Sequence, residues 1–423
     1  MSNVQLAMCN VQCAMKATVG KMTNKKAIPE IRFKGFTEAW EQRKMVDLAE
    51  YSKGNGYSKG DLTDVGTPII LYGRLYTKYQ FAINEVDTFA VPRKGAVYSQ
   101  GNEVIVPASG ETAEDIARAS AVEKSGVLLG GDLNILRPFD FINPLFLALA
   151  ISNGEPQNEL AKKAQGKSVV HIHNSDIQEV TIAYPSRTEQ DRIVSVFRNL
   201  DRLITLHQRK GEKLRNVKKS MLEKMFPKNG TNVPEIRFKG FTEAWEQRKL
   251  GETVQITMGQ SPDGNTYSDV PSDYILVQGN ADLQNGWVSP RAWTSQMTKK
   301  ADAGDLIMSV RAPAGAMGKT AYNAVIGRGV AAIKGNEFIY QLLVKMDSDG
   351  YWKALSCGST FESLNSDNIK NADVLIPDVA EQEKIGQYFA NLDRLITLHQ
   401  RELEKLQNIK QAMLEKMFKQ NNQ

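Results

Sequence analysis

The sequence lacks the features that mark secreted, membrane-spanning and disulfide-stabilised proteins. Only three cysteines occur among 423 residues, and two of them, Cys9 and Cys13, lie near the N-terminus, so they provide no disulfide framework. No apolar run approaches the roughly 18 residues that a membrane span needs. Residues 1–21 lack the basic start and apolar block of a secretory signal. We therefore expect a cytoplasmic protein with no membrane partner and with residues 1–28 as a disordered leader.

Catalytic motifs are lacking as well. Residues 315–320 read GAMGKT, the end of a phosphate-binding loop, but Pro313 stands where the loop's first glycine is required. Residues 143–146, NPLF, give only part of the Asn-Pro-Pro-Phe motif of adenine methyltransferases, and no glycine-rich cofactor loop precedes them. His171 and His173 have no third ligand at metal-binding spacing. We expect no catalytic residue, no metal site and no cofactor bound by this chain.

The most informative feature that is present is an internal repeat. Residues 29–44 and 234–249 are the same sixteen letters, PEIRFKGFTEAWEQRK, which we call the leading repeats. Two trailing repeats, residues 189–226 and 381–418, share the letters EQ, NLDRLITLHQR and MLEKMF. Between them lie body 1 (residues 45–184) and body 2 (residues 250–376), which differ in sequence and length. A constant scaffold around two different bodies predicts two distinct recognition surfaces.

The trailing repeats have the heptad pattern of long helices that pack along another helix. Capping-box spacing at Thr188 with Asp191 and at Asp378 with Glu381 predicts where they begin. His207 and His399 interrupt the apolar stripe, which favours antiparallel packing within one chain over a homodimer formed through the same stripe. The expected packing residues are Ile193, Leu200, Leu203, Leu214, Ile385, Leu392, Leu395 and Leu406.

The bodies contain short β-branched runs bounded by turn residues, with a few helical stretches between them. We expect an α/β (α+β) fold: two mixed α/β domains with a pseudo-twofold repeat, separated by two long antiparallel helices that form an intramolecular coiled coil. After the leader, the expected segments are a first domain, a first spacer helix, a second domain and a second spacer helix, at residues 29–185, 186–228, 229–377 and 378–423.

The net charge of +5 permits a nucleic-acid partner without demanding one. Loops that read DNA combine basic, amide and aromatic side chains, because Arg and Lys bind phosphates or guanine edges while Asn and Gln pair with adenine. In body 1 the candidates are Lys53, Tyr72, Arg74, Tyr76, Lys78, Ser109, Gly110, Glu111, Thr112 and Lys167. In body 2 they are Gln260, Ser261, Gln278, Asn280, Arg291, Arg311, Lys319 and Thr360.

The alternation of constant and variable segments resembles the specificity subunits of type I restriction-modification systems. The leading repeat, followed by the pattern P-x3-EQ-x2-I-x6-LD-x2-I at residues 185–204 and 377–396, is similar to that family's motif set, over roughly residues 29–423. The leader, residues 1–28, lies outside the family's pattern.

The resemblance implies two target-recognition domains, each reading half of a bipartite, asymmetric site in double-stranded DNA. It also implies helices that set the spacer between the half-sites and dock the partner subunits. The implied partners are two methyltransferase subunits, which carry S-adenosylmethionine and flip one adenine out of each half-site, and two ATP-dependent restriction subunits, which use Mg. In this interpretation the chain is not an enzyme and binds no cofactor itself.

Two other functions would require features that the sequence lacks. A stand-alone DNA-binding regulator that dimerises through its helices predicts palindromic half-sites, whereas the two bodies here differ. A methyltransferase needs cofactor and catalytic motifs that the sequence does not contain.

Overall fold

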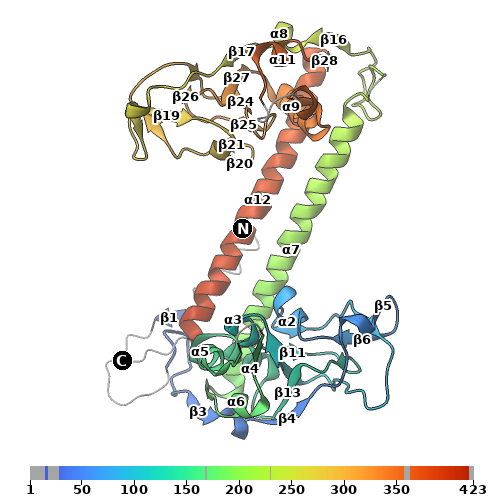
Figure 1. Ribbon diagram of the computed structural model, residues 1–423, viewed down its shortest axis with the longest axis vertical. Coiled ribbons are helices and arrows are strands. Elements are labelled where there is room, and N and C mark those ends of the chain that lie inside the picture. Colours follow the sequence, from blue (N-terminus) through green and yellow to red (C-terminus); the bar gives the residue numbers. More distant parts are fainter. Residues whose placement is uncertain (1–14, 18–27, 167–168, 229, 357–362, 419–423) are drawn as a thin grey trace. The chain divides into compact units, whose positions relative to one another are not determined.

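The computed structural model describes residues 15–17, 28–166, 169–228, 230–356 and 363–418. Contacts divide the chain into two compact units: unit 1 is Met1–Leu206 with Glu402–Gln423, and unit 2 is His207–Arg401. Each unit holds one body and a stretch of each of the two long helices, α7 (Arg187–Met225) and α12 (Val379–Phe418) (Figure 1). This division differs from the expected segments, which give each long helix a segment of its own.

The two long helices pack on each other within the chain, as expected. In unit 1, Ile193 and Leu200 from the first half of α7 share a core with Leu406 from the last half of α12. In unit 2 the arrangement is reversed, because Leu214 of α7 packs against a core that contains Ile385 and Leu392 of α12. The start of each helix therefore lies beside the end of the other, which is antiparallel packing.

Details of the helix prediction need correction. Leu395, which we expected in the packing stripe, is 38% exposed, while Leu203 is partly buried against the unit 1 core. Thr188 is not a cap: α7 begins before it, at Arg187, and the carbonyl of Ser186 accepts hydrogen bonds from the N–H groups of Glu189 and Gln190. Asp378 does cap α12, since its Oδ1 accepts from Glu381 N–H at 2.9 Å.

Body 1 contains two sheets. The larger has the order β4-β13-β9-β11-β7 and the smaller β12-β6-β8-β5. The strands of the larger sheet are β4 (Ala49–Lys53), β7 (Ala82–Ile83), β9 (Glu103–Pro107), β11 (Ser120–Val122) and β13 (Leu133–Pro138). Those of the smaller are β5 (Leu62–Thr63), β6 (Thr67–Ile70), β8 (Phe89–Ala90) and β12 (Leu128–Leu129). Two further strands, β10 (Ser109–Gly110) and β14 (Val170–His171), pair with each other.

The larger sheet has helices on one face and the smaller sheet on the other. Successive side chains of a strand point to opposite faces, so neighbouring residues of one strand pack in different cores. Val104 and Val106 of β9 pack in the core that contains α4 (Pro144–Ile151), whereas Ile105 packs in a second core with Ile70 and Leu129. Asn143 caps α4 by accepting from the N–H groups of Leu145 and Phe146. The other helices are α2 (Arg74–Thr77), α3 (Ala113–Ile116), α5 (Gly154–Lys163) and α6 (Asn174–Gln178).

Body 2 repeats this layering with its own residues. Met308 of β24 (Leu306–Ser309) packs with α9 (Glu337–Ser348), and Ile307 packs in the second core, against Val277 and Ile326. The larger sheet consists of β17 (Gln255–Met258), β27 (Val330–Lys334), β24, β25 (Met317–Lys319), β21 (Trp287–Val288) and β20 (Leu283–Gln284). The smaller consists of β18 (Tyr267–Ser268), β22 (Trp293–Thr294), β19 (Tyr274–Val277), β26 (Ala324–Ile326) and β23 (Lys300–Ala301). Short helices are α8 (Leu250–Thr253), α10 (Tyr351–Leu355) and α11 (Ser366–Lys370). The expected mixed α/β class is confirmed in both bodies.

Within the segment expected as a leader, residues 15–17 form β1 (Met15–Ala17), which pairs antiparallel with β2 (Ile31–Phe33). Within the part of the chain that the structure describes, no helix is both long and apolar enough to cross a membrane.

Candidate nucleic-acid interface

Each unit contains a joint in which its leading repeat binds the start of one long helix. In unit 1, Nε and Nη2 of Arg32 donate to the two carboxylate oxygens of Glu189, each at 2.7 Å, and the two side chains are 6% and 1% exposed. In unit 2, Arg237 and Glu381 form the same pair, also at 2.7 Å twice. Because an unpaired buried charge is strongly unfavourable, each pair fixes the leading repeat to its helix. We call these pairs and their surroundings joint 1 and joint 2.

Each joint also includes residues at the end of the other long helix. The Trp40 ring lies 5.8 Å from that of Phe146 of α4 and 6.3 Å from that of Phe418, the last residue of α12. In joint 2 the corresponding aromatic cluster is Trp245, Phe338 and Phe226. The strand that follows each tryptophan pairs with the strand before the helix: β3 (Glu41–Lys44) with β15 (Thr181–Tyr184), and β16 (Glu246–Lys249) with β28 (Asp373–Ile376). Segments far apart in the sequence thus meet in each joint.

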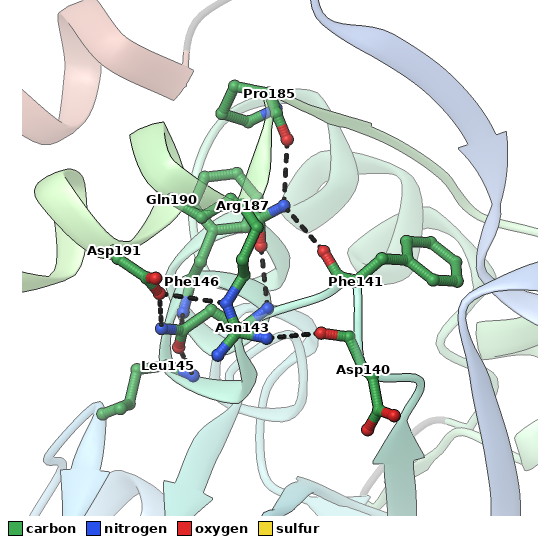
Figure 2. A network of polar contacts seen from close by, with 9 residues as sticks. All are labelled: Asp140, Phe141, Asn143, Leu145, Phe146, Pro185, Arg187, Gln190 and Asp191. Carbon is green, nitrogen blue, oxygen red and sulfur yellow. Dashed lines mark hydrogen bonds and ion pairs between the residues drawn. The ribbon is translucent and has the colours of Figure 1, made fainter.

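Polar contacts complete joint 1 (Figure 2). Oε1 of Gln190 accepts from the Asn143 backbone N–H at 2.8 Å, and its Nε2 donates to the carbonyls of Pro185 and Phe141. The Asn143 amide donates to Asp191 at 2.6 Å. Gln382 in joint 2 plays the same part, because it donates to Pro377 O and accepts from the side chain of Asn336, which caps α9. The repeated Glu-Gln pair is therefore accounted for by contacts inside each unit.

Other repeated residues are not accounted for in this way. Lys34, Thr37 and Glu38 are exposed in unit 1, as are Lys239, Thr242 and Glu243 in unit 2. None of these six has a side-chain hydrogen bond or ion pair among the described residues. Hydrogen bonds and ion pairs among the described residues therefore do not explain why these exposed side chains are repeated.

Body 1 contains a close crossing of backbone segments, which we call crossing 1. The N–H groups of Gly54 and Asn55, directly after β4, donate to the carbonyls of Leu133 and Leu129, and Gly130 N–H donates to Ile70 O. A Cβ atom on Gly54 would lie 1.8 Å from the Gly130 carbonyl oxygen, so only glycine fits there. Lys53, Asn55 and Asp132 are exposed at this crossing.

Body 2 repeats these contacts in crossing 2. Gly259 and Gln260, directly after β17, donate to Val330 O and Ile326 O, and Gly327 N–H donates to Val277 O at 2.8 Å. A Cβ on Gly259 would lie 2.1 Å from Gly327 O. The side chains are different, however: Gln260 and Arg328 are exposed, and Ser261, Gln278 and Asn280 are partly so. One backbone framework thus presents two sets of side chains.

The predicted body 1 residues do not converge on one surface. Lys53 lies at crossing 1, and the partly buried Tyr72 follows Leu71, which packs against Gly130. Arg74 and Lys78 instead bind Asp87, at 2.6 and 2.5 Å, and together they lower the pKa of that carboxyl, Lys78 most strongly. Tyr76 contacts Tyr72, with ring centroids 6.1 Å apart.

The Ser109–Thr112 segment serves the fold. Ser109 and Gly110 are buried in β10, and Ser109 Oγ lies 3.0 Å from His171 Nδ1. Thr112 caps α3 by accepting from Asp115 N–H, and Glu111 beside it is exposed. Lys167 and, in body 2, Thr360 lie outside the described residues.

The predicted body 2 residues converge better. Gln260, Ser261, Gln278 and Asn280 belong to crossing 2, and the exposed Arg311 follows Val310, whose N–H donates to Gly329 O at 2.9 Å. Two cations are paired with carboxylates of the fold. Arg291 pairs with buried Asp282, which also accepts from the N–H groups of Gln278 and Gly279 and thereby holds that turn. Lys319 pairs with Glu337 at 3.0 Å and lies over the Tyr340 ring.

Sequence reasoning missed Arg328 and Asn55, both exposed at the crossings. The triplet Gly327-Arg328-Gly329 was the available signal, because an arginine between two glycines suits a loop that approaches other backbone closely. No group of three or more His, Cys, Asp or Glu side chains within the described ranges is arranged to hold a metal ion.

Comparison with known proteins gives one consistent picture. The sequence model of the family described as "Type I restriction modification DNA specificity domain" matches residues 37–216 and again residues 242–408. The protein described as the MjaX specificity subunit of a type I restriction enzyme from Methanocaldococcus jannaschii is 26% identical over 406 residues, 89% of this chain and 92% of the relative. The MjaVIII specificity subunit of the same organism is 21% identical, over 74% and 77% of the two chains.

Two solved structures share the fold. The type I restriction-modification S subunit from M. genitalium aligns with a TM-score of 0.64 at 16% identity, over 90% of this chain and 96% of that one. A chain from a study of assembly and conformational transition in the type I R-M system aligns with a TM-score of 0.52 at 20% identity, over 90% and 97%.

Proposed function

Because the chain belongs to the family of type I restriction-modification DNA specificity domains, we propose that it selects the DNA sequence on which such a complex acts. The observation that carries this proposal is the pair of crossings. The same hydrogen bonds and close-packed glycines recur in both bodies, while the exposed side chains at them differ. A fixed backbone with exchangeable side chains suits a protein that must read different base sequences with one fold.

The two bodies read different half-sites. Crossing 1 presents Lys53, Asn55 and Asp132, whereas crossing 2 presents two glutamines and an arginine. Amides, cations and carboxylates prefer different base edges in the major groove, so the two halves of the target differ in sequence. A dimeric regulator with palindromic half-sites is not favoured, because it would present matching side chains twice.

The long helices set the number of base pairs left unread between the half-sites. Both helices have halves in both units, and a helix of 39 residues is about 58 Å long at 1.5 Å per residue. The helices α7 and α12 have 39 and 40 residues, which is long enough to span a spacer of defined size.

The exposed parts of the leading repeats dock the catalytic partners. Lys34, Thr37 and Glu38 recur as Lys239, Thr242 and Glu243, and none of the six has a side-chain hydrogen bond or ion pair to another described residue, which suits two copies of one partner. In this family's chemistry the partners are two methyltransferase subunits, which bring S-adenosylmethionine, and two restriction subunits, which use ATP and Mg. The chain itself contributes recognition and assembly in the cytoplasm and no catalysis.

Mapping of N6-methyladenine across a genome tests the proposal. The chain is produced together with the adenine-methyltransferase subunit of a type I restriction-modification system, in a host without adenine methylation of its own, and the methyltransferase alone is the control. We expect methylation at a split, asymmetric motif that appears only when the chain is present. The same methylated motif with and without the chain would exclude a specificity function.

A further inference from the structure

The cations of body 2 fall into two classes. Arg291 and Lys319 are held by Asp282 and Glu337, so their charges serve the fold. Arg328 is exposed, and within the described part of the chain its side chain has no hydrogen bond, ion pair or ring contact. A guanidinium without an internal partner retains all five N–H donors for a ligand.

The backbone around Arg328 is fixed although its side chain is free. Arg328 N–H donates to Ser261 Oγ at 3.2 Å, and Gly327 N–H donates to Val277 O. On the other side, a Cβ on Gly329 would lie 1.9 Å from Gln278 O. Neighbours on both sides therefore hold the Cα of Arg328 in place, which reduces the ordering that binding requires.

Two amide side chains lie in the same crossing. Gln260 follows Gly259 and is exposed, and the Cγ atom of Gln278 lies 3.4 Å from where a Cβ on Gly327 would be. Buried Asp282 accepts from Gln278 N–H at 2.6 Å, so the backbone of this glutamine is held as well. An arginine and two glutamines are thus presented from segments that are fixed against each other.

We infer that Arg328, Gln260 and Gln278 form the base-reading set of body 2, and that their ligand is the major-groove edge of purines. The inference rests on the proposed function. Arginine pairs with O6 and N7 of guanine, and glutamine pairs with N6 and N7 of adenine. Crossing 1 has Gly131 in the chain position of Arg328, because Leu129 and Leu133 take the hydrogen-bonding places of Ile326 and Val330. The arginine contact therefore belongs to the half-site of body 2 alone.

The methylation map described above, repeated with Arg328→Ala and with Gln278→Ala, tests this assignment. Arg328→Ala should make one guanine of one half-site degenerate, with on the order of a 10- to 100-fold loss of discrimination at that position. Gln278→Ala should relax a different, adenine position in the same half-site, and the other half-site should keep its sequence in both variants. Lys345→Ala is the matched control, because it removes a cation from α9 that pairs with Asp349, and it should leave the motif intact.

The outcomes separate the two proposals. The assignment is overturned if the motif and its methylation are unchanged in Arg328→Ala. It is also overturned if the motif keeps its sequence but the level of methylation decreases equally at all copies, because a uniform decrease is typical of a lost phosphate contact. Thermal unfolding shows whether each variant is folded, and Arg328→Ala should not shift the midpoint, since no described side-chain contact is lost. If the parent chain gives no split motif, the proposed function itself fails.

Discussion

The two joints and the two crossings are both repeated in this molecule, but different things are repeated. The joints use the same side chains twice, with Arg32 and Glu189 matched by Arg237 and Glu381. The crossings repeat backbone hydrogen bonds and glycines, while Gly131 and Arg328 occupy corresponding positions. Side chains are constant in the joints and variable at the crossings, as expected if the crossings discriminate between DNA sequences.

Removal of one partner of a joint ion pair should have the largest effect. Glu189→Ala leaves the Arg32 guanidinium, whose side chain is 6% exposed, without its counter-charge, and we expect a loss of roughly 3–5 kcal/mol in the free energy of unfolding. Glu381→Ala should lose a similar amount in unit 2, and denaturant-induced unfolding measures both. The double substitution Arg32→Met with Glu189→Leu should recover most of the loss. A loss below about 1 kcal/mol would show that the joint ion pairs do not stabilise the units in which they lie.

Substitution of a crossing glycine should have the next largest effect and should act on one body only. Gly259→Ala places a Cβ 2.1 Å from Gly327 O, and the forced backbone shift should cost about 1–3 kcal/mol. The body 2 half of the methylated motif should degenerate while the body 1 half persists. Gly54→Ala should do the reverse. Gly264→Ala, with no atom within 4 Å of the added Cβ, is the control, and equal effects of Gly264→Ala and Gly259→Ala would refute the crossing as a fixed framework.

A smaller difference in the free energy of unfolding should distinguish two matching ion pairs between the long helices. Lys410 binds Asp201 at 2.5 Å in unit 1, and Lys218 binds Asp393 at 2.6 Å in unit 2. Only Asp393 also accepts from buried Gln341, at 2.8 Å. Asp393→Ala should therefore destabilise the protein by about 1 kcal/mol more than Asp201→Ala, because the Gln341 amide loses an acceptor. Equal losses, measured by calorimetry, would contradict this.

The smallest effect concerns the cations that bind Asp87. Lys78 and Arg74 lower the pKa of this carboxyl, so its ionised form stabilises body 1 above the unfolded-state pKa of about 3.9. That contribution is lost as the pH falls through the lowered folded-state pKa. Since Asp87 is 61% exposed, Asp87→Asn should lose less than about 1 kcal/mol at pH 7. The difference in the free energy of unfolding between Asp87→Asn and the parent should vanish in acid. A difference that grows in acid would contradict a lowered pKa of Asp87.

The repetition in the sequence was enough to predict the arrangement of the scaffold. The leading repeats and heptads predicted two domains and antiparallel helices, and the β-branched runs of the bodies predicted their mixed α/β fold. Ile193, Leu200, Ile385 and Leu392 are buried as expected. The prediction that Leu395 is buried was wrong because the heptad pattern identifies a helix face but not the extent to which the neighbouring helix covers it. Thr188 was wrong because the helix begins at Arg187, before the predicted cap.

The candidate site was predicted less well, and the reason is physical. Arg74, Lys78, Arg291 and Lys319 are basic residues near turns, but carboxylates brought close by the fold bind all four. Sequence reveals a cation but not whether a distant Asp or Glu will neutralise it. Gln260 and Gln278 converge only because Gly259, Gly327 and Gly329 let three segments pack closely, and that depends on contacts between segments far apart in the chain.

Joint 1 has a consequence for biosynthesis. Body 1 leaves the ribosome first, yet its core includes Met413, Met417 and Phe418 from the far end of the chain. During translation, apolar side chains of body 1 remain partly exposed until more than two hundred further residues have been synthesised. A nascent chain stalled before residue 400 would lack the final helical turns that cover Trp40 and Phe146, and should recruit chaperones or precipitate even though every residue of the first-made domain is present.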